Sequence, residues 1–124
     1  MPILRFADAP EFDLSGIRVR GLASPSRGST ESMTYRLDIT GGQHVLSHTH
    51  DHEEVSHLLS GRWTVTIEGT DTPLEPGDTV IVPTGVTHAS YTREGEEAVI
   101  LTTMPVGTRT IRPDGERVSP PWGR

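Results

Sequence analysis

Glycine and proline interrupt this chain so frequently that no segment offers room for a long helix. The 124 residues include 13 Gly and 10 Pro, spread along the whole length, and both residue types weaken helix interiors. Between these breaks, short runs alternate apolar and polar side chains, as where Met33, Tyr35, Leu37 and Ile39 occupy every second position. Alternation with a period of two predicts strands that bury one face. We expect strands at residues 17–22, 33–39, 44–50, 55–59, 63–68, 79–82, 88–92 and 98–104.

This succession of strands determines the expected fold class. Many short strands at nearly even spacing, without a helical period or an internal repeat, are typical of all-β sandwiches and barrels. A chain of 124 residues is long enough for one domain with a single core. We expect the barrel core at about residues 33–104, N-terminal strands within residues 1–32, and an irregular C-terminal arm at residues 105–124.

The charged residues exclude several classes of function. Lys and Arg together number 11 against 17 Asp and Glu, so the formal net charge is 11 − 17 = −6. An acidic chain is a poor partner for nucleic acid or an anionic membrane. All basic residues are Arg, and the absence of Lys excludes Schiff-base and pyridoxal-phosphate lysines as well as a P-loop lysine. The absence of Cys excludes disulfides and thiolate nucleophiles. Because apolar runs are short, we expect a cytoplasmic protein without a membrane span.

The histidines carry the main functional signal. His48 and His50 lie two residues apart on an expected strand, so their side chains share one face and can reach one ion together. Glu54 follows after enough residues for a small turn, and His88 joins them only if folding brings it there. Three imidazoles and one carboxylate suit a divalent Fe, Mn, Ni, Co or Zn ion. The alternative interpretation is a solvated loop that is merely rich in His and acidic residues.

Two spaced motifs narrow this choice. The pattern Gly42-x5-His48-x-His50-x3-Glu54-x6-Gly61 resembles the first motif of the cupin superfamily, and Gly77-x5-Pro83-x-Gly85-x2-His88 resembles the second. The resemblance runs from Gly42 to Thr92 and implies a single small cupin domain over residues 1–124, folded as a double-stranded β-helix or jelly-roll barrel. It also implies that His48, His50, Glu54 and His88 bind one divalent transition metal ion. Thr92 stands where the second motif commonly has Asn.

Other polar residues near these motifs have alternative interpretations. His52 has the strand parity of His48 and replaces Glu54 as a ligand if the turn falls later. His44 also has this parity, so it either lines the cavity as a catalytic proton shuttle or has a structural role. His57 has the opposite parity from Glu54 and is expected on the outside, at a possible subunit contact. Arg36 either anchors a substrate carboxylate or lies on the surface. Asp51 and Glu53 are expected to be solvated turn residues.

Metal-site chemistry leads to the functional hypothesis. We expect a metal-dependent enzyme that acts on a small oxygenated organic molecule, with Glu54 and His44 as the candidate acid–base residues. Two reaction types remain open, because small cupins resemble quercetin-type dioxygenases and polyketide cyclases equally. The first is oxidation by a dioxygenase. The second is isomerase, cyclase or lyase chemistry through a metal-bound enolate. The alternative is a cupin module that binds metal or a small ligand without turnover. We also expect a homodimer in which residues 2–22 add to the partner's sheet.

Overall fold

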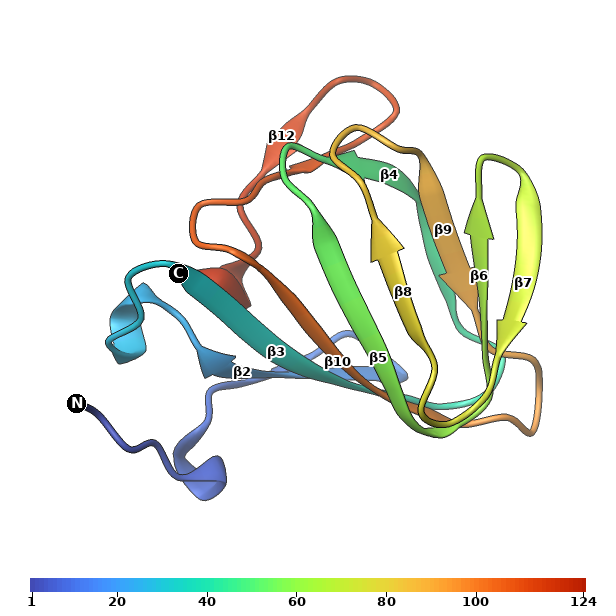
Figure 1. Ribbon diagram of the computed structural model, residues 1–124. Coiled ribbons are helices and arrows are strands. Elements are labelled where there is room, and N and C mark those ends of the chain that lie inside the picture. The colour runs from blue at the N-terminus through green and yellow to red at the C-terminus, as the bar shows by residue number, and fades with distance from the viewer.

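Two antiparallel sheets face each other in the computed structural model, which describes residues 1–124 (Figure 1). The first sheet has the order β1 (Glu11–Asp13), β2 (Ile17–Ala23), β3 (Ser32–Ile39), β10 (Ala98–Pro105), β5 (Glu54–Gly61) and β8 (Thr79–Val82). The second has the order β12 (Arg117–Val118), β11 (Thr110–Ile111), β4 (His44–His50), β9 (His88–Tyr91), β6 (Trp63–Ile67) and β7 (Thr70–Leu74). The expected all-β jelly-roll architecture is confirmed.

All eight expected strands are present, with ends that move by two residues at most, but four other strands were missed. One of these is β7, which contains Pro73 and pairs only with β6 at the edge of its sheet. Proline is acceptable in such an edge strand, although a proline in the sequence usually indicates that the segment is not a strand. Glu68 and Gly69 connect β6 to β7 and both have positive φ, 49° and 83°, as a tight two-residue hairpin requires.

The C-terminal arm is more ordered than the expected irregular segment. Its strands β11 and β12 extend the second sheet beyond β4. The arm then ends in a 3₁₀ turn, η3 (Pro121–Gly123), where Trp122 packs on Phe12 and Tyr35 at ring-centroid distances of 5.9 and 5.7 Å. The arm thus contains two short strands and one 3₁₀ turn within an otherwise irregular segment. Two-residue strands offer too short a pattern for alternation to predict them, and their pairing depends on β4.

The interior contains both apolar and polar regions. One apolar cluster fills the space between the sheets and consists of Ile39, Leu58, Trp63, Val65, Ala98 and Ile100. A second cluster lies beneath the C-terminal arm and consists of Val19, Met33, Tyr35 and Met104. Buried polar side chains occupy the rest, among them His50, Glu54, Ser56, His88 and Thr102. None of the helical segments is long and apolar enough to cross a membrane.

Gly61 shows why the first motif ends in glycine. It closes β5 with a φ of +89°, a conformation that side chains with a Cβ rarely adopt. A Cβ atom at this position would also overlap the carbonyl oxygen of Glu97. Glycine is therefore required here by both the backbone angle and the close approach of the chain that leads into β10.

Candidate metal centre

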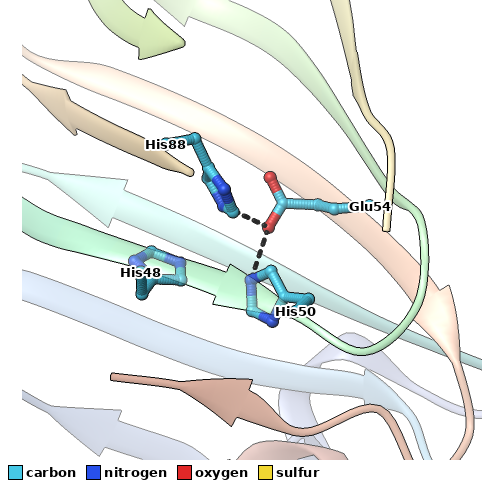
Figure 2. Close-up of side chains that lie close together, drawn as sticks. All are labelled: His48, His50, Glu54 and His88. Atoms are coloured by element: carbon cyan, nitrogen blue, oxygen red, sulfur yellow. Dashed lines mark ion pairs between the residues drawn. The ribbon is translucent and has the colours of Figure 1, made fainter. Parts of the chain in front are cut away.

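Four side chains converge between the sheets at one end of β4, β5 and β9 (Figure 2). His48, His50, Glu54 and His88 each offer one donor atom, and these atoms lie within 4.8 Å of one another. Glu54 Oε1 lies 3.2 Å from His50 Nε2 and 3.7 Å from His88 Nε2. The ring centroids of His48 and His88 are 4.3 Å apart. The structure thus brings together all four residues of the expected ligand set.

The strand register explains how residues far apart in sequence meet. His48 of β4 is paired directly with His88 of β9, and facing residues on neighbouring strands place their side chains side by side. His50 lies two residues further along β4, so its side chain shares that face. The turn at residues 51–53 then reverses the chain, and Glu54 is the first residue of β5. His52, the alternative ligand, lies in this turn and is exposed, which excludes it from the cluster.

Hydrogen bonds to the outer ring nitrogens orient two of the histidines. Nδ1 of His48 lies 2.6 Å from the carbonyl oxygen of Leu46, and Nδ1 of His88 lies 3.0 Å from that of Val86. A carbonyl only accepts, so each Nδ1 carries the hydrogen and each Nε2 keeps a free lone pair. Nε2 of His50 and of His88 is buried without a hydrogen bond. Buried ring nitrogens that lack a hydrogen bond and lie only beside a carboxylate oxygen fit a metal site.

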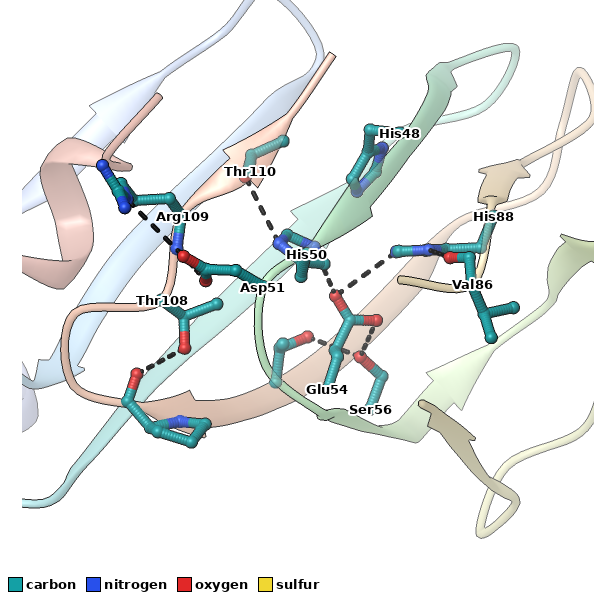
Figure 3. A network of polar contacts seen from close by, with 12 residues as sticks. His48, His50, Asp51, Glu54, Ser56, Val86, His88, Thr108, Arg109 and Thr110 are labelled. Carbon is teal, nitrogen blue, oxygen red and sulfur yellow. Dashed lines mark hydrogen bonds and ion pairs between the residues drawn. The ribbon is translucent and has the colours of Figure 1, made fainter. Parts of the chain in front are cut away.

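Hydroxyl groups support the Glu54 carboxylate at Oε2, the oxygen that does not face the histidines (Figure 3). Ser56 Oγ donates to Glu54 Oε2 at 3.2 Å and lies 2.8 Å from Thr102 Oγ1. All three residues are buried. Sequence reasoning missed Ser56 and Thr102 as parts of the site. Alternation in β5 contained the signal for Ser56, because it places residues 54 and 56 on the same face.

Burial and mutual attraction determine the charges in the cluster. Burial would raise the pKa of Glu54, but the imidazoles of His50 and His88 hold that pKa well below its usual range. Burial would lower the pKa of His88, but its contact with Glu54 raises that pKa overall. The pKa of His48 is lowered, chiefly by burial. The cluster thus contains an ionised Glu54 and a His48 that favours the neutral form, and these are the forms in which the two side chains bind a cation.

His44 lies outside this cluster, so the prediction that it lines the cavity as a catalytic proton shuttle is wrong. The register between β4 and β9 shifts between Val45 and His48: His44 is paired with Tyr91, whereas His48 is paired with His88. Such a bulge moves the side chains before it to the opposite face. His44 is exposed and stacks on the Tyr91 ring at 5.7 Å. A parity count from sequence assumes a regular strand and cannot detect this shift.

The remaining polar residues lie outside the cluster. Arg36 pairs with Asp38 at 2.8 Å on the outer face, in agreement with the surface interpretation. His57 also faces outward, where Nδ1 contacts Thr79 Oγ1 at 2.7 Å. Thr92 is buried and its hydroxyl donates to the Thr40 carbonyl oxygen at 2.8 Å. Its hydroxyl therefore joins the end of β9 to the turn before β4.

Asp51 differs from its expected role as a solvated turn residue. Its carboxylate accepts a hydrogen bond of 2.7 Å from the backbone N–H of Arg109 in the C-terminal arm. Burial would raise the pKa of Asp51, but the bonds from Arg109 and His52 lower it overall. The sequence held no signal for this contact, because its partner lies 58 positions away. Glu53, by contrast, is exposed as expected.

Comparisons with known proteins agree with this fold. A family model described as a cupin domain matches residues 35–104. The polyketide cyclase RemF from Streptomyces resistomycificus has a similar structure, with a TM-score of 0.78 at 17% identity over 96% of this chain and 82% of that chain. KdgF from Halomonas sp. gives a TM-score of 0.71 at 21% identity over 85% and 94% of the two chains.

A larger protein contains the same fold. A variant of oxalate decarboxylase from B. subtilis gives a TM-score of 0.73 at 21% identity over 82% of this chain but 28% of its own. No curated protein matches the sequence. At these identities, the solved structures establish the barrel fold, and the cluster itself provides the evidence about chemistry.

Proposed function

Because the chain belongs to the cupin family, we propose that it is a metal-dependent enzyme that acts on a small oxygenated organic molecule. The observation that carries this proposal is the buried cluster of His48, His50, Glu54 and His88, whose donor atoms lie within 4.8 Å of one another. The donor set suits one divalent Fe, Mn, Ni, Co or Zn ion. Such an ion, when bound, polarises a carbonyl or hydroxyl oxygen and lowers the pKa of bound water.

Hydroxyl side chains surround the proposed metal site. Ser56 and Thr102 line the buried side of Glu54, and Ser90 lies two residues beyond His88 on the same face of β9. The hydroxyls of Ser56 and Thr102 are used within the protein, on Glu54 and on each other, so they position this carboxylate. Glu54 presents the one ionised carboxylate of the cluster and is its candidate acid–base group.

Two reaction classes fit this arrangement. One is oxidation by dioxygen, and the other is isomerisation, cyclisation or bond cleavage without a change of oxidation state. Similar folds occur in a protein named as a polyketide cyclase and in one named as an oxalate decarboxylase. Both classes need a group that takes a substrate proton and a cation that stabilises the resulting charge, and Glu54 with a bound ion can supply both.

Metal analysis of protein purified without an affinity tag tests the proposal. We expect close to one transition metal ion per chain, loss of that ion in His88→Ala, and full retention in Arg36→Ala, whose side chain lies on the outer face. A panel of diketones and flavonol-like compounds should be converted only by the metal-loaded protein. Conversion without oxygen supports the redox-neutral class. Stoichiometric metal in His88→Ala contradicts the ligand assignment, and ligand-induced stabilisation without product indicates a binding module.

We also propose that the protein is a homodimer. The N-terminal segment exposes Ile3, Leu4 and Phe6, with 76%, 41% and 47% of their surface accessible. Residues 17–23 pair with β3 of the same chain, and β1, which pairs with β2 alone, lies at one of the two edges of the first sheet. A free edge beside exposed apolar side chains favours association with a second copy. Light scattering at micromolar concentration should give twice the mass of the chain, and a monomer would contradict this proposal.

A further inference from the structure

The three histidines of the cluster are not oriented in the same way. Nδ1 of His48 and Nδ1 of His88 each contact a carbonyl oxygen two residues earlier in their own segment. Nδ1 of His50 instead faces Thr110 Oγ1 at 3.4 Å, and Thr110 belongs to β11 of the C-terminal arm (Figure 3). The orientation of this ring therefore depends on a segment 60 positions away.

Asp51 ties the arm to the strand that carries His50. The backbone N–H of Asp51 donates to the carbonyl oxygen of Arg109 at 3.2 Å, and the Asp51 carboxylate accepts from the backbone N–H of Arg109 at 2.7 Å. This reciprocal contact places Thr110 directly opposite His50 in the register of β4 and β11. On the other side, the backbone N–H of Gly85 donates to the His50 carbonyl oxygen at 3.0 Å. His50 is thus fixed between the arm and the loop that precedes His88.

We propose that the C-terminal arm is a working part of the metal centre, in which Asp51 anchors the arm and the Thr110 hydroxyl orients the imidazole of His50. Thr110 Oγ1 accepts the hydrogen on Nδ1, so Nε2 keeps its lone pair and would be available to hold a metal ion. Thr110 is a positioning residue, because it acts through His50. The inference rests on the proposed metal binding, and it assigns a role to residues beyond position 104, where the family match ends.

The physical reason lies in the two forms of a neutral imidazole. One ring nitrogen carries the hydrogen and the other binds the metal, and the partner of the first nitrogen selects which is which. Without a partner at Nδ1, the His50 ring can place its hydrogen on Nε2, where Glu54 Oε1 lies 3.2 Å away to accept it, and that nitrogen then cannot act as a ligand. Loss of such an outer contact typically weakens metal binding about 10–100-fold.

Three variants test the proposal through Co(II) affinity, measured by competition with a chromophoric chelator. Thr110→Val removes the hydroxyl and keeps the branched shape, so we expect at least about tenfold weaker binding. Thr110→Ser keeps the hydroxyl and should restore most of the affinity. The matched control is Thr103→Val, which removes a hydroxyl paired with Thr34 Oγ1 at 3.2 Å on the outer face of β10. This control should bind Co(II) like the unmodified protein.

A second measurement separates orientation from general damage to the fold. In the metal-free protein, ¹⁵N NMR should show the hydrogen of neutral His50 on Nδ1, and Thr110→Val should shift it partly to Nε2. Thr103→Val and Thr110→Ser should leave it on Nδ1. Failure of the unmodified protein to bind Co(II) would contradict the proposed function, while the NMR result would still test the role of Thr110. Unchanged Co(II) affinity and an unchanged hydrogen position in Thr110→Val would overturn the inference.

Discussion

The two ends of the barrel interior are built from the same strands but have opposite chemistry. Along the inner face of β5, Glu54 and Ser56 at the metal end are followed by Leu58 in the apolar cluster. Along β10, Thr102 at the metal end follows Ile100 in that cluster. Strand alternation therefore decides which side chains face inward, whereas position along the strand decides whether the interior is polar or apolar.

The apolar end of the interior mainly stabilises the fold, whereas the metal end carries the groups for chemistry. Burial of Leu58, Ile100 and the side chains around them removes apolar surface from water and stabilises the fold. Burial of Glu54 and His88 is unfavourable unless each group finds a partner. The apolar end can therefore offset the cost of holding charged and polar groups at the metal end. Substitutions at the two ends should then have separable effects.

The largest effect on stability is expected at the apolar end. Leu58 is fully buried, so Leu58→Ala should reduce the free energy of unfolding by about 2–5 kcal/mol. Leu59→Ala is the matched control, because Leu59 is the next residue of β5 and is 42% exposed; its effect should stay within about 0.5 kcal/mol. Urea denaturation measures both values. Equal losses in the two variants would show that Leu58 is not packed in the core.

A smaller effect is expected from the hydroxyl group that supports Glu54. Ser56→Ala removes the hydrogen bond to Glu54 Oε2 and leaves Thr102 without its partner. We expect metal affinity to fall about 10–100-fold, with isothermal titration of Co(II) as the measurement. Ser60→Ala changes an exposed serine of the same strand and should bind Co(II) normally. Unchanged affinity in Ser56→Ala would remove Ser56 from the metal end.

Glu54→Gln tests the electrostatic coupling at the metal end in the metal-free protein. Burial lowers the pKa of His88, and contact with Glu54 raises it above the usual value. The variant keeps the burial and loses the charge, so the pKa of His88 should fall, as followed by NMR titration. Glu53→Gln, in the exposed turn, is the control and should leave that pKa unchanged.

The contact between Glu54 and His88 also determines how the stability of the fold depends on pH. A raised pKa of His88 contributes stability below about pH 6.5, the unfolded value, and this contribution is lost as pH rises through the folded pKa. A lowered pKa of Glu54 contributes stability above about pH 4.3 and loses it at lower pH. The stability difference between the unmodified protein and Glu54→Gln should therefore be largest between these two values. A constant difference from about pH 4 to about pH 8 would contradict the coupling.

The sequence was more informative about the four candidate metal ligands than about the residues that hold them in place. Strand alternation and the spacing of the two motifs predicted the barrel and brought His48, His50, Glu54 and His88 into one hypothesis. The missed strand β7 and the ordered arm depend on pairing with other strands, which local patterns do not encode. Thr110 and Asp51 acquire their roles only when the arm pairs with β4. Contacts between distant segments were therefore the part that sequence reasoning could not predict.

The smallest effect is expected at His44, where strand parity failed. The bulge in β4 places His44 on the outer face against Tyr91, so His44→Ala should change the free energy of unfolding by no more than about 0.5 kcal/mol. Its Co(II) affinity should equal that of the unmodified protein, whereas His48→Ala should lose stoichiometric binding. The two residues differ by four positions in one strand and share the same chemistry, so only the face of the sheet distinguishes them. Equal loss of Co(II) in both variants would mean that β4 is regular and that His44 faces the cluster after all.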